Sequence, residues 1–470
     1  MIKRNIFENI NPFDHRYSYQ NDTYKSLKKY LSEEANINYQ LKVELALIKA
    51  LNKLEVCSES VVDEVKEAIE EINGEKAYLE EKKTKHNIRA LVNLIQQNVS
   101  ESSKPYIHLT ATSYDIVDTA NSLRYREVTN DIILPKLKEL IEILSELALQ
   151  EKDTLQIGRT HGQHAVPVTF GYVLAGFVER LGLRYVEIKN KADLLKGKFS
   201  GACGTYNASS LFFEDPVLFE ETVMDELGLQ AGDFSSQIVI AEYMTDFIHS
   251  IISTFGVLAN FSDDMRNLQR TEINEVGEYF SKDQVGSSTM PHKRNPINYE
   301  NIKSMWKKTM PQMNTVYMDQ ISEHQRDLSN SASSRFIPDI IVGFTLSINR
   351  LIKVLKKFGI DRKKMKENFN MYSEMIIAEP LYIILASQGH PDAHEAVRKL
   401  TLQSEKGDKS PRELFYLKDE FKEYREKLTE YQKLIINNPQ KYTGAAKKRT
   451  EYIIKKWENK LKKERLNNGN

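Results

Sequence analysis

The 470-residue sequence predicts an all-α protein with three helical domains. Apolar residues recur at intervals of three and four residues through long stretches, which is the spacing of one buried helix face. The longest of these stretches cover residues 119–152, 168–199 and 238–274, and none shows the alternation of apolar and polar residues that is typical of strands. We therefore expect a central helix-bundle domain over residues 111–360, between smaller helical domains over residues 1–110 and 361–470.

The two flanking domains show the same helical spacing. Residues 25–98 repeat it twice, with Asn73-Gly74 as the break between two helices. After residue 361 the composition shifts to short charged helices, and the last expected helix is amphipathic. Its apolar positions follow one another at i, i+4 and i+8: Ile453, Trp457 and Leu461.

Charge and cysteine content exclude several classes of protein. Lys and Arg number 66, as do Asp and Glu, so no overall field recruits nucleic acid or an anionic membrane. Cys57 and Cys203 lie far apart without metal-ligand spacing, which argues for a reducing compartment and against a disulfide framework or a zinc site. We recognise neither a signal peptide nor a run of about 18 apolar residues. A cytoplasmic protein without nucleic-acid or membrane partners is expected.

The most distinctive stretch, residues 286–300, reads Gly-Ser-Ser-Thr-Met-Pro-His-Lys-Arg-Asn-Pro-Ile-Asn-Tyr-Glu. Gly286 permits backbone geometries closed to other residues. Pro291 and Pro296 fix their own φ and disfavour helix just before them. We predict an ordered, hinged loop and a helix that resumes after Pro296.

This stretch concentrates two serines, two cations and an amide: Ser287, Ser288, Lys293, Arg294 and Asn295. Neighbouring cations and amide donors stabilise an anion, whether a ligand carboxylate or an alkoxide. Such a loop suits removal of a proton next to a carboxylate. Composition alone favours a plainer interpretation, an ordinary polar surface loop.

A second polar cluster precedes an expected helix within residues 106–119. His108, Thr112, Ser113 and Asp115 lie where a helix N-terminus presents free backbone N–H groups to anions, which would suit a dicarboxylate ligand. The plainer interpretation is a capping box, with Ser113 or Asp115 as the cap.

Two further segments carry candidate chemistry. Residues 158–164 read Gly-Arg-Thr-His-Gly-Gln-His, with histidines at i and i+3 that on a helix could bind a metal. No carboxylate or cysteine nearby completes a ligand set, so acid–base use is favoured over metal binding. Later, Arg326, Ser331 and Arg335 can hold a phosphate. By composition this segment is equally an N-terminal capping segment.

The stretch Gly-Ser-Ser-Thr-Met-Pro-His-Lys-Arg-Asn-Pro resembles the signature of the fumarase/aspartase superfamily of lyases, most closely its adenylosuccinate lyase branch. The resemblance implies a central long-helix bundle and β-elimination of fumarate from a C–N bond. It implies adenylosuccinate as a substrate that gives AMP, and SAICAR as one that gives AICAR, in purine nucleotide biosynthesis. It also implies no cofactor, no metal and a homotetramer whose active sites take segments from three subunits.

The resemblance assigns catalytic roles to particular residues. His161 lies in a block similar to the one whose histidine protonates the leaving group. Ser287 is the expected base, with Ser288 as its rival, and Lys293 helps to stabilise the alkoxide once the loop has closed. Glu300 resembles the carboxylate that orients the acid histidine.

The residues that the resemblance assigns to substrate binding are spread along the chain: Arg16, Tyr17, His86, Asn87, His108, Thr112, Ser113, Thr160, Gln237, Ser288, Asn295, Arg326, Ser331 and Arg335. The block around Arg326 and the Arg16-Tyr17 pair are similar to contacts with a nucleotide phosphate. Without the resemblance, the Arg16-Tyr17 pair is ordinary surface and His86 is a surface or capping group at a helix start.

The sequence departs from the family pattern at several places, among them Gln325 and Ala332, which replace the usual Glu and Ser of the block around Arg326. Asn87 stands where Asp is typical, Thr110 where glycine is usual, and Ala241-Glu242 where an Arg-Asp pair is typical. The missing pair favours an alternative, a sister lyase or cycloisomerase acting on another substrate such as argininosuccinate or a carboxymuconate.

Other residues argue against that alternative and against a second one. Ser331 and Arg335, with Arg16, favour a phosphorylated substrate. A non-catalytic helical scaffold is the second alternative, and the intact His161 and Glu300 oppose it, together with Ser287 and Lys293.

Overall fold

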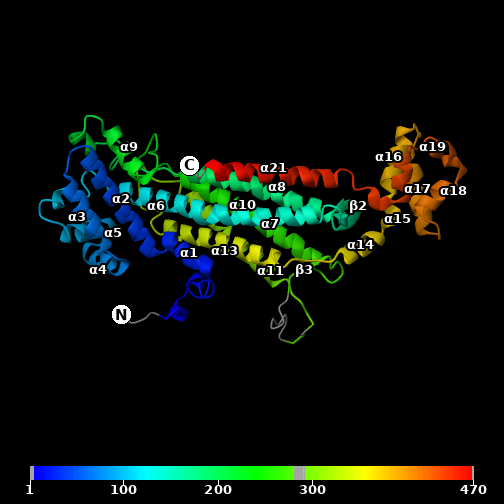
Figure 1. The fold of residues 1–470 in the computed structure, drawn as a ribbon, viewed down its shortest axis with the longest axis horizontal. Helices are drawn as coiled ribbons and strands as arrows, with labels where there is room; N and C mark the ends of the chain where they lie inside the picture. Colours follow the sequence, from blue (N-terminus) through cyan, green and yellow to red (C-terminus); the bar gives the residue numbers. More distant parts are fainter. Residues whose placement is uncertain (1–4, 280–288, 291, 468–470) are drawn as a thin grey trace. The chain divides into compact units, whose positions relative to one another are not determined.

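The structure, a computed structural model, describes residues 5–279, 289, 290 and 292–467 (Figure 1). It groups the chain into two compact units. The first comprises Met1–Leu137, Leu183–Leu258 and Ile302–Arg350, and the second comprises Lys138–Gly182, Ala259–Asn301 and Leu351–Asn470. The internal boundaries fall inside the long helices α7 (Leu134–Gln150), α8 (Phe170–Asp193), α10 (Glu242–Leu268), α11 (Ile297–Thr309) and α13 (Ile337–Leu355). The division predicted at residues 110 and 360 stays a prediction.

The first unit is built around α2. Its complete helices are α1 (Asp22–Leu31), α2 (Glu33–Lys53), α3 (Glu59–Glu70), α4 (Gly74–Thr84), α5 (Asn87–Gln97), α6 (Ser113–Val128), α9 (Pro216–Leu227) and α12 (Gln312–Met318). The expected break is confirmed, because Asn73 caps α4 by accepting the Lys76 N–H at 3.0 Å. Apolar side chains of α2, α3, α5, α6 and α9 form one buried core, with Leu47, Val65 and Phe219 fully buried.

The remaining strands and helices belong to the second unit. They are β1 (Leu155–Thr160), β2 (Gln163–Thr169), β3 (Val276–Gly277), β4 (Gly359–Ile360), α14 (Arg362–Asn370), α15 (Ser373–Ile376), α16 (Ala378–Ser387), α17 (Ala393–Glu405), α18 (Pro411–Leu417), α19 (Lys422–Glu426), α20 (Glu430–Asn437) and α21 (Ala446–Asn467). Figure 1 shows α16 to α19 gathered together, and a separate apolar core lies among them. The predicted shift to short helices after residue 361 is thus confirmed.

Helix α21 packs against α8 through the predicted apolar positions. Trp457 is fully buried, and its Nε1 donates to Glu179 Oε2 at 2.6 Å. The ring fits because residue 182 is glycine, since a Cβ there would lie 2.3 Å from the indole. Ile453 and Leu461 are buried on the same side.

The all-α class is confirmed, although the structure adds strands that the sequence did not predict. β1 and β2 form an antiparallel hairpin, and β3 pairs with β4 over two residues. Two expected helices are also divided. The 119–152 stretch passes from α6 to α7 through a π-helical turn at Thr129–Ile133, and the helix expected after Pro296 is split at Pro311 into α11 and α12. No helix in the described part of the chain has both the length and the apolar content to cross a bilayer.

Candidate active site

His161 lies at the tip of the β1–β2 hairpin. Thr160 pairs with Gln163, so His161 and Gly162 form a two-residue turn. Both have positive φ, +53° and +76°, which is the conformation that tight hairpins with matching twist require. The imidazole is exposed, as are Thr160 and Gln163. The two histidines therefore do not lie on a helix, the arrangement in which they could have bound a metal, because Gly158, Gly162 and Pro167 favour a turn between short β-branched runs.

The base of the hairpin is fixed by buried Glu275. This carboxylate has no exposed surface and receives four hydrogen bonds from three side chains. Arg159 donates through Nη2 at 2.6 Å and Nη1 at 3.2 Å, Gln156 donates at 2.7 Å and Asn368 at 2.8 Å. The charge of Glu275 is thus paired and its oxygens are satisfied. The role of Glu275 could not be predicted from the sequence, because its partners lie far away in the chain.

His164 differs from His161 in its surroundings. Burial, and then the charge of Arg159, lower the pKa of His164. Its Nδ1 is buried without a hydrogen-bond partner among the described residues, and its ring meets Tyr372 edge-on. In the described part of the chain, no cluster of His, Cys, Asp and Glu has the arrangement to hold a metal ion.

The signature stretch is described only from Thr289 onward, apart from Pro291. Ser287 and Ser288 lie outside the described residues. His292, Lys293, Asn295 and Glu300 line a cavity of about 940 Å³ in the second unit, together with Arg266 and Gln269. Gln269 donates to the carbonyl of Arg294 at 3.3 Å. The cavity therefore presents cations and amides, together with the carboxylates of Glu278 and Glu300.

A helix does resume after Pro296, since α11 begins at Ile297. Glu278 occupies its N-terminus by accepting the N–H groups of Asn298 at 2.9 Å and Tyr299 at 3.0 Å. Glu300 follows in the first turn and is exposed. Among the described residues of the second unit, Glu300 and His161 form no hydrogen bond with each other.

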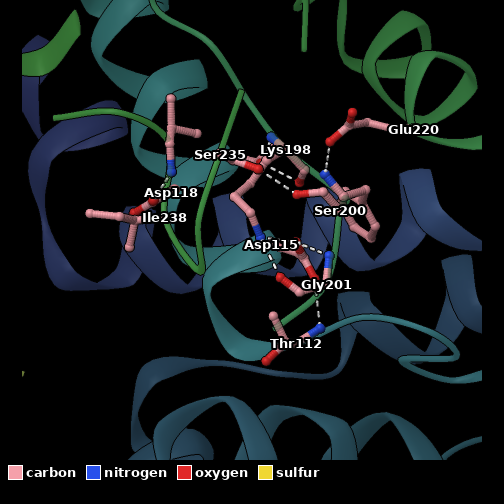
Figure 2. A network of polar contacts seen from close by, with 12 residues as sticks. Thr112, Asp115, Asp118, Lys198, Ser200, Gly201, Glu220, Ser235 and Ile238 are labelled. Carbon is pink, nitrogen blue, oxygen red and sulfur yellow. Dashed lines mark hydrogen bonds and ion pairs between the residues drawn. The ribbon is translucent and has the colours of Figure 1, made fainter. Parts of the chain in front are cut away.

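The start of α6 forms the candidate anion site of the first unit. The cap is Thr112 rather than Ser113 or Asp115, and its N–H donates to Asp115 at 2.7 Å. Asp115 also accepts the Gly201 N–H at 3.3 Å and forms an ion pair with Lys198 (Figure 2). Asp115 and Lys198 are almost fully buried. The predicted capping box is confirmed, but the prediction of Ser113 or Asp115 as the cap was wrong.

His86 and Ser113 come together at this place. Ser113 Oγ lies 3.4 Å from Nε2 of His86. Nδ1 of His86 accepts the Arg89 N–H at 3.2 Å, so His86 also caps α5 as predicted for a histidine at a helix start. Because Nδ1 is an acceptor, the neutral ring carries its proton on Nε2 and donates it to Ser113.

His108 lies in the same loop, and its Nδ1 is 2.7 Å from Glu44 on α2. The departure at Thr110 has a visible consequence, since this residue has φ +67° and a buried hydroxyl without a hydrogen-bond partner among the described residues. Glycine adopts that backbone conformation without strain. Thr110 therefore places strain next to the candidate site.

The candidate phosphate contacts do not form one cluster. Arg326 stacks over the Tyr114 ring at 4.8 Å and lines a cavity of about 110 Å³ that Ala241 also lines. Arg335 lines a different cavity of about 500 Å³, together with Asn87. Ser331 is exposed.

The remaining candidate binding residues of the first unit, Gln237, Arg16 and Tyr17, lie in two separate places. The Gln237 N–H donates to the carbonyl of Gln325 at 3.3 Å, which brings Gln237 beside the segment of Arg326. Arg16 is exposed, and Tyr17 packs against Phe13 with ring centroids 5.6 Å apart. Phe13, but neither Arg16 nor Tyr17, lines the 500 Å³ cavity.

Comparison with solved structures agrees with the fold class. The 3-carboxy-cis,cis-muconate lactonizing enzyme from Pseudomonas putida aligns with a TM-score of 0.81 at 23% identity, covering 93% of this chain and 97% of that one. A fumarate lyase from Mesorhizobium sp. BNC1 aligns with a TM-score of 0.79 at 21% identity, covering 92% and 97%.

Sequence comparison identifies the family. A family model described as lyase matches residues 11–310, and one described as adenylosuccinate lyase C-terminal matches residues 322–442. The adenylosuccinate lyase of Archaeoglobus fulgidus is 32% identical over 463 residues, covering 97% of this chain and 100% of the relative. That of Pyrococcus abyssi is 34% identical over 451 residues, covering 95% and 97%. The chain belongs to the adenylosuccinate lyase branch of the lyase family.

Proposed function

We propose that this protein cleaves adenylosuccinate to AMP and fumarate, and SAICAR to AICAR and fumarate, in purine nucleotide biosynthesis. The observation that carries the proposal is the agreement of its relatives, which match 97% and 95% of the chain and are named adenylosuccinate lyase. The cationic cavity around Lys293 supports the same reaction, because the succinyl group of the substrate carries two carboxylates.

The elimination needs a base and an acid. A base takes the proton from the carbon beside a carboxylate, the electron pair forms the new C=C bond, the C–N bond breaks, and the departing nitrogen receives a proton. We assign the acid to His161, whose exposed ring at a hairpin tip can reach a ligand. We assign the base to Ser287, with Ser288 as the alternative, and the stabilisation of its alkoxide to Lys293.

The other candidate residues hold the anionic groups of the substrate. Thr112 and Ser113, at the start of α6, and His86, which bonds Ser113, suit a carboxylate. Arg326 and Arg335 are assigned to the phosphate, with Ser331, Arg16 and Tyr17 in support. The remaining contacts to substrate are assigned to Asn87, His108, Thr160, Gln237, Ser288 and Asn295.

The protein is proposed to act as a homotetramer with active sites shared between subunits. Within one chain, His161 and Glu300 form no hydrogen bond among the described residues, although Glu300 is assigned to orient the acid histidine. In the proposed tetramer, His161 of one subunit and Glu300 of another subunit would come into contact. This assembly predicts that a mixture of His161→Ala and Ser287→Ala subunits regains activity that neither variant has alone, since some mixed sites contain both groups. No recovery after exchange of subunits would contradict shared sites.

The function is tested by measuring fumarate release from adenylosuccinate, SAICAR, argininosuccinate and a carboxymuconate. We expect release from the first two alone, and its loss in His161→Ala and in Ser287→Ala. His394→Ala is the matched control, because His394 is exposed on α17 and has no assigned role. Turnover of argininosuccinate or of the carboxymuconate in place of adenylosuccinate would overturn the proposal in favour of a sister enzyme. No turnover of any substrate would favour a scaffold.

A further inference from the structure

Glu44 and His108 form a pair between the middle of α2 and the loop that precedes α6. Glu44 Oε1 lies 2.7 Å from His108 Nδ1. The Glu44 side chain is 2% exposed, whereas that of His108 keeps 20% of its surface. The carboxylate is thus enclosed, and only the histidine reaches solvent.

The second oxygen of Glu44 is unusual because it is buried without a hydrogen-bond partner among the described residues. A buried carboxylate oxygen left unsatisfied destabilises the folded state, and an apolar residue of similar size would pack into α2 at lower cost. Leu47 and Ile48, which follow on the same helix, are buried as expected. Packing alone therefore gives no reason for a carboxylate at this position, and its 2.7 Å contact with His108 points to a function of the pair.

The backbone of His108 is held in an uncommon conformation with φ +61°. Non-glycine residues in the left-handed region are uncommon, and they cluster at ligand sites where their surroundings hold them. With Nδ1 engaged by Glu44, the other ring nitrogen, Nε2, is the one that remains for a ligand. Nε2 has no hydrogen-bond partner among the described residues.

Besides burial, three neighbouring charged groups shift the pKa of His108: Glu44, Asp115 and Arg89. Burial lowers the pKa of His108, but the carboxylate of Glu44 and then that of Asp115 raise it by more, against a smaller opposing effect of Arg89. The net pKa lies above the ordinary value of 6.5. Asp115 is itself paired with Lys198, so Glu44 is the main source of negative charge at the ring.

We propose that Glu44 is a positioning residue that keeps His108 protonated and directs its Nε2–H to a negatively charged oxygen of the substrate. The inference rests on the proposed function for the identity of the ligand. It goes beyond that function by assigning a role to a residue that does not itself touch substrate. Carboxylate and phosphate are the two anionic groups of adenylosuccinate, and both would accept this hydrogen bond.

The first test measures protonation of His108 without any substrate. Hydrogen–deuterium exchange at the imidazole C2, followed by mass spectrometry of the peptide that contains His108, gives its titration curve in the intact protein. We expect the Glu44→Gln variant, which keeps the size and an acceptor but removes the charge, to shift the His108 midpoint down by about one pH unit, a tenfold change in proton affinity. The His394 peptide serves as the internal control.

The second test uses kinetics across pH. For Glu44→Gln we expect the KM for adenylosuccinate to rise about tenfold near pH 8 and to return toward the wild-type value near pH 6, where the ring regains its proton, with kcat nearly unchanged. Competition by fumarate and by AMP identifies the anion. Weaker inhibition by fumarate alone assigns the contact to a carboxylate, and weaker inhibition by AMP alone assigns it to the phosphate.

The outcomes separate the two proposals. An unchanged His108 midpoint in Glu44→Gln, or a KM increase that is equal at all pH values, would overturn the role of Glu44 even if the protein is active. A protein without lyase activity would overturn the proposed function, while the exchange experiment would still decide the state of His108. If the variant does not fold, the wild-type curve decides, because a midpoint below 6.5 contradicts the proposal.

Discussion

Arg159 and Glu275 form a bidentate ion pair at the base of the hairpin that carries His161, with Nη2–Oε1 at 2.6 Å and Nη1–Oε2 at 3.2 Å. Glu275 is fully buried. Ile157, in the same strand β1, packs against Phe369 of α14. The position of the exposed imidazole is therefore set by a buried ion pair at Arg159, two residues before it, and by an apolar contact at Ile157, four residues before it.

Glu275→Gln should destabilise the second unit and reduce activity. The substitution leaves the guanidinium of Arg159 partly buried without its counter-charge, and breaking a buried pair in this way costs about 3 to 5 kcal/mol. Chemical denaturation measures the loss. Glu272→Gln is the control, because Glu272 is exposed and lies 3.7 Å from Arg270, so its change should stay within about 0.5 kcal/mol. Equal losses in the two variants would contradict a specific role for the buried pair.

Lys198→Met should destabilise the first unit by a similar amount, about 3 to 5 kcal/mol, since Asp115 would remain buried without its cation. Thermal and chemical unfolding measure this effect. Lys196→Met is the matched control from the same segment, where the exposed ammonium donates to Gln230 at 2.6 Å. Its effect should be small.

A double variant distinguishes lost charge pairing from lost packing at Lys198. Lys198→Met combined with Asp115→Asn removes both charges, so it should recover part of the stability that the single lysine variant loses. Asp115→Asn keeps an acceptor for the Thr112 N–H that now donates at 2.7 Å. No recovery in the double variant would show that Lys198 acts through its packing.

The helices could be predicted from the sequence because their information is local. The three-and-four spacing indicated the long helices, Pro296 marked the start of α11, and His86 was recognised as a possible cap. The β1–β2 hairpin was missed because each strand is short and Pro167 lies inside the second. Two-residue strands such as β3 carry no periodic signal.

The supporting residues of the site were missed for a different reason. Glu44, Glu275 and Lys198 each pair with a partner more than sixty positions away in the chain. Such long-range pairs do not alter the local spacing of apolar residues from which the helices were predicted. One signal existed. Glu44 lies three residues after Leu41 and four before Ile48, on the apolar face of α2, where an ionisable residue needs a partner.

Gly182→Ala should destabilise the packing of α21 against α8. A Cβ at this position would lie 2.3 Å from the Trp457 ring, so the helix or the indole must move, and overpacking of this kind costs about 1 to 3 kcal/mol. Gly176→Ala is the control on the same helix, because a Cβ there meets no atom within 4 Å. That substitution should stabilise α8 by up to about 1 kcal/mol. Opposite signs in denaturation curves are the expected result.

Asp118→Asn should stabilise the first unit at alkaline pH. Asp118 accepts the Val239 N–H at 3.0 Å in the wall of the 110 Å³ cavity, and burial raises its pKa from 3.8 to about 6. The folded state therefore holds this proton more tightly than the unfolded chain, so the contribution of Asp118 to stability is greatest below pH 3.8 and is lost as pH rises through about 6. An amide cannot ionise and still accepts the N–H. The gain should reach about 3 kcal/mol above pH 7, since one pKa unit corresponds to about 1.4 kcal/mol.

Asp327 provides the control of opposite sign for Asp118. The Ser329 hydroxyl and the backbone N–H groups of Ser329 and Glu323 donate to its carboxylate and hold its pKa below the ordinary value of 3.8. Its contribution is therefore present above pH 3.8 and lost as pH falls through the lowered pKa, so Asp327→Asn should destabilise the protein near pH 7. Measurement of Tm from about pH 4 to pH 8 should give a gain for Asp118→Asn that grows with pH. A gain of equal size at both ends would show that ionisation of Asp118 is not its cause.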